Sequence, residues 1–136
     1  MTYDRKGADL QVIVPGFSLA DTLNCGQCFR WEPCGKGFRG IHRGIITTVY
    51  QDGDQICFRD TDAEIYQTIW APYFDLDADY GSMQQPFQTD STLRAACETA
   101  GGIHILRQDP WEALCSFIIS QNNNIPRIRG IISRLC

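Results

Sequence analysis

The 136-residue sequence has little of what membrane, secreted or disordered proteins need. No apolar run approaches the roughly 20 residues of a membrane helix. The N-terminal stretch MTYDRKGADLQ has neither an apolar segment nor a small-residue cleavage site. Disorder is disfavoured because 43% of the residues are apolar and the net charge is only -4. We therefore expect a folded, monomeric protein of the cytoplasm, with a bacterial source favoured by the compact loops.

The machinery of several enzyme classes is also missing. Only two lysines, Lys6 and Lys36, and two histidines, His42 and His104, are present, and no G-x-S-x-G elbow accompanies the histidines. The glycines at 35, 37 and 40 match a dinucleotide-binding pattern by spacing alone, because they lie in an expected hairpin rather than between a strand and a helix. Serine hydrolases and nucleotide-binding proteins are therefore disfavoured, and we expect no cofactor.

Cysteine is abundant instead, and its odd count of seven does not suggest a disulfide framework in a chain without a signal peptide. The spacing Cys25-x-x-Cys28, followed by Cys34, leaves a zinc site with His42 as fourth ligand as one interpretation. The favoured interpretation is that the thiols are free and serve as small apolar residues. We accordingly predict no metal ligands.

The first half of the chain predicts an antiparallel sheet. Short segments rich in β-branched and aromatic residues alternate with turn residues at 33–37, 44 and 52–54. The expected strands are residues 10–14, 27–32, 38–43, 45–51 and 55–59. Between the first two, residues 18–26 read as a short helix with Ser18 as N-cap, Asp21 near a capping-box position and Gly26 as the stop.

The second half predicts helices. Thr61-Asp-Ala-Glu64 resembles a capping box at the start of a helix reaching residue 73, and Thr89-Asp90 precedes a second helix that Gly101-Gly102 ends. Asp109-Pro110 is the strongest start signal, with Asp as N-cap and Pro in the first turn. Residues 111–119 are apolar on nearly all sides, which predicts a buried core helix. The fold class is α+β, with a sheet domain over residues 1–88 and the beginning of a helical domain over 89–136.

The last expected helix, from residue 125, is basic and amphipathic. Isoleucine and leucine recur at spacings of three and four, and arginines occupy the other faces. The sequence stops within this pattern at Cys136, without a capping glycine. Either the helices at 90–100 and 111–119 cover the apolar stripe or the polypeptide is cut short, and the second explanation is favoured.

Residues 120–127, Ser-Gln-Asn-Asn-Asn-Ile-Pro-Arg, separate the last two helices with four consecutive amides. Amide side chains and arginine offer the donors and acceptors that suit base edges and phosphates. The same residues could form a turn held by bonds from side chains to the backbone. From the residues alone both interpretations stay open.

Three motifs occur in order along the chain. They are Asn24-Cys-Gly-Gln-Cys-Phe-Arg-Trp31, Tyr73-Phe-Asp-Leu-Asp77, and Ile105-Leu-Arg-Gln-Asp-Pro-Trp-Glu112, which leads into Ser116-Phe-Ile-Ile-Ser-Gln-Asn-Asn-Asn-Ile-Pro-Arg127. Together they resemble the N-terminal portion of 8-oxoguanine DNA glycosylases of the helix-hairpin-helix superfamily, over roughly residues 10–136. The resemblance implies an antiparallel sheet domain of TATA-binding-protein-like shape, followed by the first helices of an all-α glycosylase domain.

The resemblance also implies roles for individual residues. Gly26 matches the glycine whose carbonyl accepts the extra N7 hydrogen of the oxidised guanine in the lesion pocket, and normal guanine would present an acceptor there instead. Phe29 matches a residue that supports this pocket. Asn122 matches the asparagine that fills the gap left by the flipped base, and Arg127 matches an arginine that reads the opposite cytosine.

The function implied is base-excision repair by a DNA glycosylase and abasic-site lyase. Its substrate would be double-stranded DNA with 8-oxoguanine opposite cytosine, and a lysine amine would form a Schiff base with the sugar. No catalytic residue is expected within the chain, because the family's lysine and aspartate match positions beyond Cys136, and the chain alone is expected to be inactive. The alternative function is a non-catalytic sheet module that binds DNA or protein, against which the acidic first hundred residues count.

Overall fold

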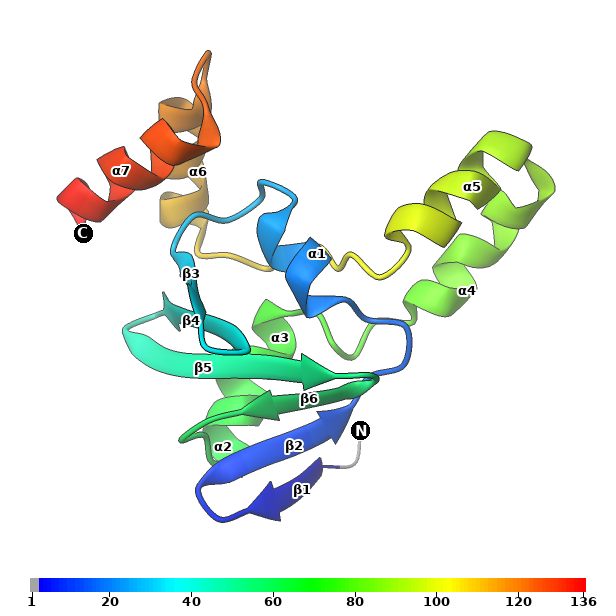
Figure 1. The fold of residues 1–136 in the computed structure, drawn as a ribbon, viewed down its shortest axis with the longest axis horizontal. Coiled ribbons are helices and arrows are strands. Elements are labelled where there is room, and N and C mark those ends of the chain that lie inside the picture. The colour runs from blue at the N-terminus through cyan, green and yellow to red at the C-terminus, as the bar shows by residue number, and fades with distance from the viewer. Residues whose placement is uncertain (1–2) are drawn as a thin grey trace.

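The computed structural model describes residues 3–136 and contains one six-stranded antiparallel sheet (Figure 1). The strands lie in the order β1-β2-β6-β5-β4-β3. Their bounds are β1 Tyr3–Lys6, β2 Asp9–Ile13, β3 Trp31–Cys34, β4 Gly37–His42, β5 Ile45–Asp52 and β6 Gln55–Phe58. The predicted α+β class and antiparallel sheet are confirmed.

The strand predictions were right for the four central strands and wrong for the two edge strands, β1 and β3. The predicted strand at residues 27–32 begins only at Trp31, because residues 25–30 form a loop. Strand β1 was not predicted, since its sequence Tyr-Asp-Arg-Lys has no apolar alternation. Charged side chains are common on edge strands, where they discourage pairing with a further strand.

The core lies between the sheet and the helical segment that follows it. Leu10, Phe58, Val49 and Phe38 are direct partners across β2, β6, β5 and β4, so their side chains form one row on the same face. Helices α2 (Ala63–Ile65) and α3 (Ala71–Tyr73), with the π-helical turn η1 (Tyr66–Trp70) between them, run behind this face in Figure 1. Trp70 and Phe74 from this region are buried in the same core.

The helix predicted from the Thr61–Glu64 pattern exists, but its cap lies one residue later. Asp62 is the N-cap and its side chain accepts a hydrogen bond from the Ile65 amide at 2.7 Å. Thr61 is buried instead and donates to the Arg59 carbonyl. The capping-box pattern located the helix correctly, although it named the wrong residue as the cap.

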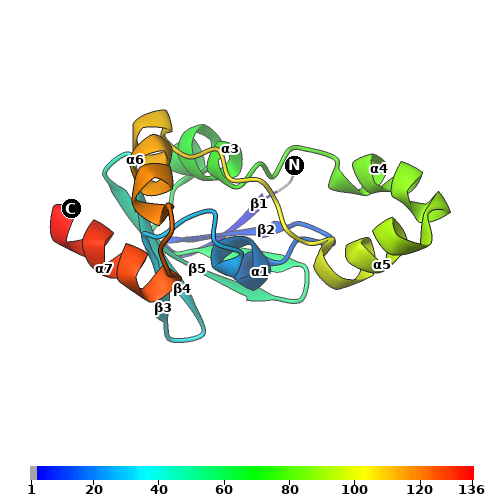
Figure 2. The ribbon, with the colours of Figure 1, turned by 90° about the horizontal axis from the view of Figure 1, so that it is seen from above.

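Two helical arms project from opposite sides of the sheet body (Figures 1 and 2). One arm consists of α4 (Tyr80–Gln84), the 3-10 turn η2 (Gln85–Thr89) and α5 (Ser91–Ala100). The other consists of α6 (Pro110–Ser120) and α7 (Ile125–Leu135), and we call it the α6–α7 hairpin. Asp109 caps α6 as predicted, Asp90 of the predicted Thr89-Asp90 entry caps α5, and each accepts two backbone hydrogen bonds.

The expectation that residues 111–119 form a buried helix was wrong. Four large apolar side chains of α6 are exposed to solvent. The exposed fractions are 72% for Trp111, 49% for Leu114, 63% for Phe117 and 62% for Ile118. Helix α7 covers only one side of α6, with Ile128 and Ile132 buried. Helix α5 lies across the molecule and covers none of this face (Figure 2). The apolar residues on all sides of α6 therefore did not correctly predict that this helix is buried by the other elements of residues 3–136.

No helix within residues 3–136 is long and apolar enough to cross a membrane.

Candidate functional site

The loop of residues 25–30, which we call the Gly26 loop, follows α1 (Leu19–Asn24) and leads into β3. Ser18 caps α1 as predicted, and the helix ends at Cys25. Gly26 has a φ of +91°, a conformation that favours glycine. Among residues 3–136 no backbone or side-chain group donates to the Gly26 carbonyl oxygen. The loop therefore contains a backbone acceptor without an internal partner.

Gln27 holds the loop against the extended segment at residues 103–108. Its side-chain nitrogen donates to the carbonyls of Thr22, at 3.0 Å, and His104, at 2.8 Å. Its side-chain oxygen accepts from the Leu106 amide at 2.9 Å. The Gln108 side chain in turn donates to the Gln27 carbonyl at 2.5 Å. The Gln27 side-chain amide thus bonds to backbone groups as a neighbouring strand would. These bonds hold the residue next to Gly26 in place.

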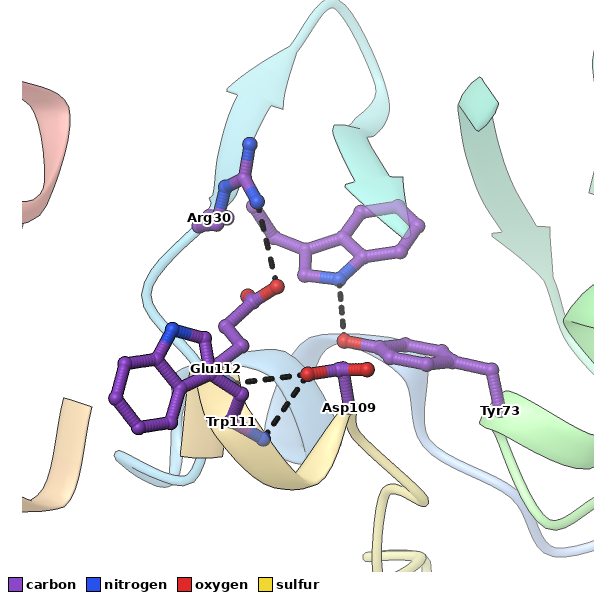
Figure 3. Close-up of polar contacts among 6 residues, drawn as sticks. Arg30, Tyr73, Asp109, Trp111 and Glu112 are labelled. Atoms are coloured by element: carbon purple, nitrogen blue, oxygen red, sulfur yellow. Dashed lines mark hydrogen bonds and ion pairs between the residues drawn. The ribbon is translucent and has the colours of Figure 1, made fainter. Parts of the chain in front are cut away.

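The other end of the loop is anchored in the core by Trp31. Its indole N–H donates to the Tyr73 hydroxyl at 2.8 Å, as Figure 3 shows. A Cβ at Gly40, its strand partner, would lie only 2.3 Å from the indole ring, so the ring needs glycine beneath it. Burial raises the pKa of the Tyr73 hydroxyl, and the Trp31 hydrogen bond opposes this in part. The hydroxyl therefore stays protonated and the anchor is uncharged.

Helix α6 begins beside the loop. The Asp109 carboxylate accepts from the backbone amides of Trp111 and Glu112, at 3.0 and 3.2 Å (Figure 3). The Glu112 carboxylate points the other way and pairs with the Arg30 guanidinium at 3.3 Å. This ion pair joins the Gly26 loop directly to the helix that leads to the predicted Asn122 and Arg127.

The amide-rich connection between α6 and α7 divides into bonded and unbonded side chains. Gln121 and Asn123 donate to the Phe117 and Ile119 carbonyls, and Asn124 caps α7 by accepting from the Arg127 amide at 3.1 Å. Asn122 lies in the left-handed region with a φ of +50° and is exposed. Its side chain bonds to nothing within residues 3–136. The turn interpretation thus accounts for three amides and leaves Asn122 available.

Arg127 lies in the first turn of α7 with an exposed side chain. Arg129 behaves differently, because its Nε is buried without a hydrogen-bond partner and its charge acts on Cys28. Arg129 also lines a groove of about 230 Å³ with Phe29 and Arg30 of the Gly26 loop. Sequence reasoning singled out Gly26, Asn122 and Arg127 but missed Arg129. Nothing in the helical pattern distinguishes the two arginines.

The cysteines do not gather into a metal site. Burial raises the pKa of the Cys28 thiol to about 12, and it donates to the Leu23 carbonyl. Cys25 and Cys34 are exposed. Because zinc binds the thiolate, a protonated and buried Cys28 is a poor ligand. The part of the chain that the structure describes contains no group of three His, Cys, Asp or Glu side chains placed to hold a metal ion.

An antiparallel sheet joined to a capped helical hairpin is the architecture that this chain shares with solved DNA glycosylases. Apo Clostridium acetobutylicum 8-oxoguanine glycosylase/lyase is similar, with a TM-score of 0.88 and 37% identity over 95% of this chain and 46% of that chain. The same enzyme with double-stranded DNA containing cytosine opposite 8-oxoguanine gives a TM-score of 0.89. The family model for the 8-oxoguanine DNA glycosylase N-terminal domain matches residues 10–114, and the chain belongs to this family.

A curated relative agrees with this assignment. The N-glycosylase/DNA lyase of Saccharomyces cerevisiae is 32% identical over 138 residues, which cover 87% of this chain and 35% of the yeast protein. The chain therefore spans about a third of the yeast relative and just under half of the clostridial one.

Proposed function

We propose that the chain supplies the lesion-reading part of an enzyme that excises 8-oxoguanine from duplex DNA and cleaves the resulting abasic site. The Gly26 carbonyl carries this proposal. It is an acceptor without an internal partner, on a loop fixed at both ends by Gln27 and Trp31. The oxidised guanine presents an N7 hydrogen to such an acceptor, whereas guanine presents an acceptor and would be repelled.

The α6–α7 hairpin supports the same function. Extruding a base from the duplex costs a few kcal/mol, and a side chain that occupies the vacated position offsets that cost. Asn122 suits this role because its amide is exposed and unbonded within the described residues, and Arg127 offers a planar fork to the opposite cytosine.

The nucleophile is proposed to come from outside residues 1–136. A lysine amine must reach the sugar to form the Schiff base. Lys36 lies exposed in the turn between β3 and β4, away from the Gly26 loop. The residues that line its groove include the arginine Arg59 and contain neither a carboxylate nor a histidine to activate the amine. We therefore assign recognition rather than bond cleavage to this chain.

A chimaera tests the proposal. Residues 1–136 would replace the matching segment of the clostridial glycosylase/lyase, and cleavage of duplexes with 8-oxoguanine opposite each base would be measured. We expect cleavage opposite cytosine, and we expect Arg127→Gln to lower the preference for cytosine. Arg134→Gln, on the last turn of α7, is the matched control and should keep it. A folded chimaera that leaves 8-oxoguanine opposite cytosine uncut would refute the proposal.

A further inference from the structure

One ion pair connects the sheet body to the α6–α7 hairpin. Two further ion pairs among the side chains that the structure describes, Arg59–Asp9 and Arg107–Asp75, lie elsewhere. The Arg30–Glu112 pair spans 82 residues of sequence. The Arg30 side chain is 27% exposed, so it is better shielded from water than the side chains of Arg59 and Arg107, at 60% and 71%.

Within residues 3–136, the Gly26 loop makes no second ion pair or hydrogen bond to α6. Gln27 binds the loop to the segment at 103–108, and Trp31 binds it to Tyr73 in the core. These anchors fix the loop to the sheet body, but neither reaches the hairpin. Within the hairpin, α7 packs beside α6 and has Ile128 and Ile132 buried.

Glu112 is well placed to hold α6 in one direction. It lies in the first turn of α6, where a carboxylate also favours the positive end of the helix. Its backbone amide is bound by Asp109, so the helix start is rigid and the side chain is directed to Arg30. The pair therefore connects the Gly26 loop to the capped first turn of α6.

We propose that the Arg30–Glu112 pair is a positioning device that sets the Gly26 carbonyl relative to the hairpin carrying Asn122 and Arg127. Lesion choice requires the flipped base and the vacated stack to be engaged at once, so the loop and the hairpin must be held in a fixed relation. This inference rests on the proposed function, and Arg30 and Glu112 act on the base only through the elements that they join.

Charge exchange tests the device in the free chain. Arg30→Glu and Glu112→Arg should each speed amide hydrogen exchange in residues 24–31 and in the first turn of α6. The double variant R30E/E112R should slow it again, judged against Glu112→Arg alone because arginine is unfavourable at a helix start. Arg59→Glu, which breaks the pair with Asp9 on the sheet, is the matched control and should leave both segments unchanged. Unchanged exchange in both single variants would overturn the proposal.

A second readout separates positioning from stability. Fluorescence anisotropy would give the ratio of affinities for duplexes with 8-oxoguanine or guanine opposite cytosine. We expect the ratio to fall about two- to fivefold in each single variant, as suits a partly shielded pair, and to recover in the double variant. A ratio that stays constant while exchange rises would show a merely structural pair and overturn the proposal. If the unmodified chain shows no preference, the proposed function fails, whereas the exchange result still decides whether the pair couples loop and hairpin.

Discussion

At the scale of single residues, the backbone of Gly26 matters more than the space around it. A Cβ built at this position meets no atom within 4 Å, so an added methyl group would not clash. The constraint is the φ of +91°, which side chains rarely tolerate. A substitution here therefore tests the conformation of the loop rather than its packing.

Gly26→Ala should destabilise the chain by about 1–2 kcal/mol, the usual penalty for a left-handed residue with a side chain. The measurement is urea unfolding followed by circular dichroism. Gly81→Ala is the control, because Gly81 lies in α4 and its added Cβ would only approach Asp79 at 3.5 Å. Alanine there should stabilise by about 0.5–1 kcal/mol. Equal effects at the two positions would contradict the conformational argument.

Residue patterns predicted the helix caps well and the loop anchors poorly. Ser18 and Asp109 were identified because a cap bonds to amides two or three residues away, so the signal is local. Gln27 bonds to Leu106, which lies 79 residues away, and no local spacing announces such a partner. Its importance could be found only from its place inside a recognisable motif.

At the scale of elements, the connection between α6 and α7 contains two asparagines with different roles. One side chain bonds to the backbone of α7, and the other, within residues 3–136, is free to bind a ligand. Asn124 caps α7, whereas the Asn122 side chain has no bond within the described residues. The two amides therefore predict opposite effects of substitution.

Asn124→Ala should lower the free energy of unfolding by about 1 kcal/mol through loss of the cap. Asn122→Gly should leave stability nearly unchanged, because glycine accepts the left-handed backbone, but it should weaken binding to duplexes containing 8-oxoguanine. Thermal unfolding and fluorescence anisotropy would measure the two effects. A large loss of stability in Asn122→Gly would contradict the assignment of Asn122 to DNA.

The sheet was predictable as an element because its turns and β-branched residues repeat at short intervals, and the helices because their caps are local. Helix α6 was misjudged for a physical reason. An apolar sequence indicates that a surface favours burial, but the neighbouring elements determine whether it is buried. Only α7 among the described elements packs along α6, and it covers one side of that helix. The extended segment at 103–108 was likewise not predicted, since its bonds, apart from that of the Ile103 amide to the Ala100 carbonyl, are to distant residues.

At the scale of the whole molecule, two buried histidines link stability to pH. Burial lowers the pKa of His42, with Arg43 acting in the same direction and Asp109 opposing. Burial also lowers the pKa of His104, which stacks on Tyr80 at 3.8 Å between ring centres. Both histidines therefore bind protons more weakly in the folded state than in the unfolded state.

Because the unfolded histidines titrate near 6.5, acidification below that value favours the unfolded state. Urea midpoints should accordingly be lower at about pH 5.5 than at about pH 7.5. His104→Asn, whose amide can replace the ring nitrogen 3.1 Å from the Phe74 carbonyl, should narrow the difference. Asp79 does not interfere, since hydrogen bonds from Ser82 hold its pKa below its usual value of 3.8. Equal midpoints at the two pH values would contradict this account.

The bond between Gln27 and Leu106 also sets an order of events during synthesis. Leu106 follows Gln27 by 79 residues, and the stretch between them includes strands β3 to β6 and the whole arm of α4 and α5. At translation rates of about 5–20 residues per second, the ribosome needs roughly 4–16 seconds to make that stretch. The sheet can pair its strands during this interval, while the Gln27 side chain has only the Thr22 carbonyl to bond and lacks its partners at His104 and Leu106. The part proposed to recognise damage is therefore among the last to take its final shape on a growing chain.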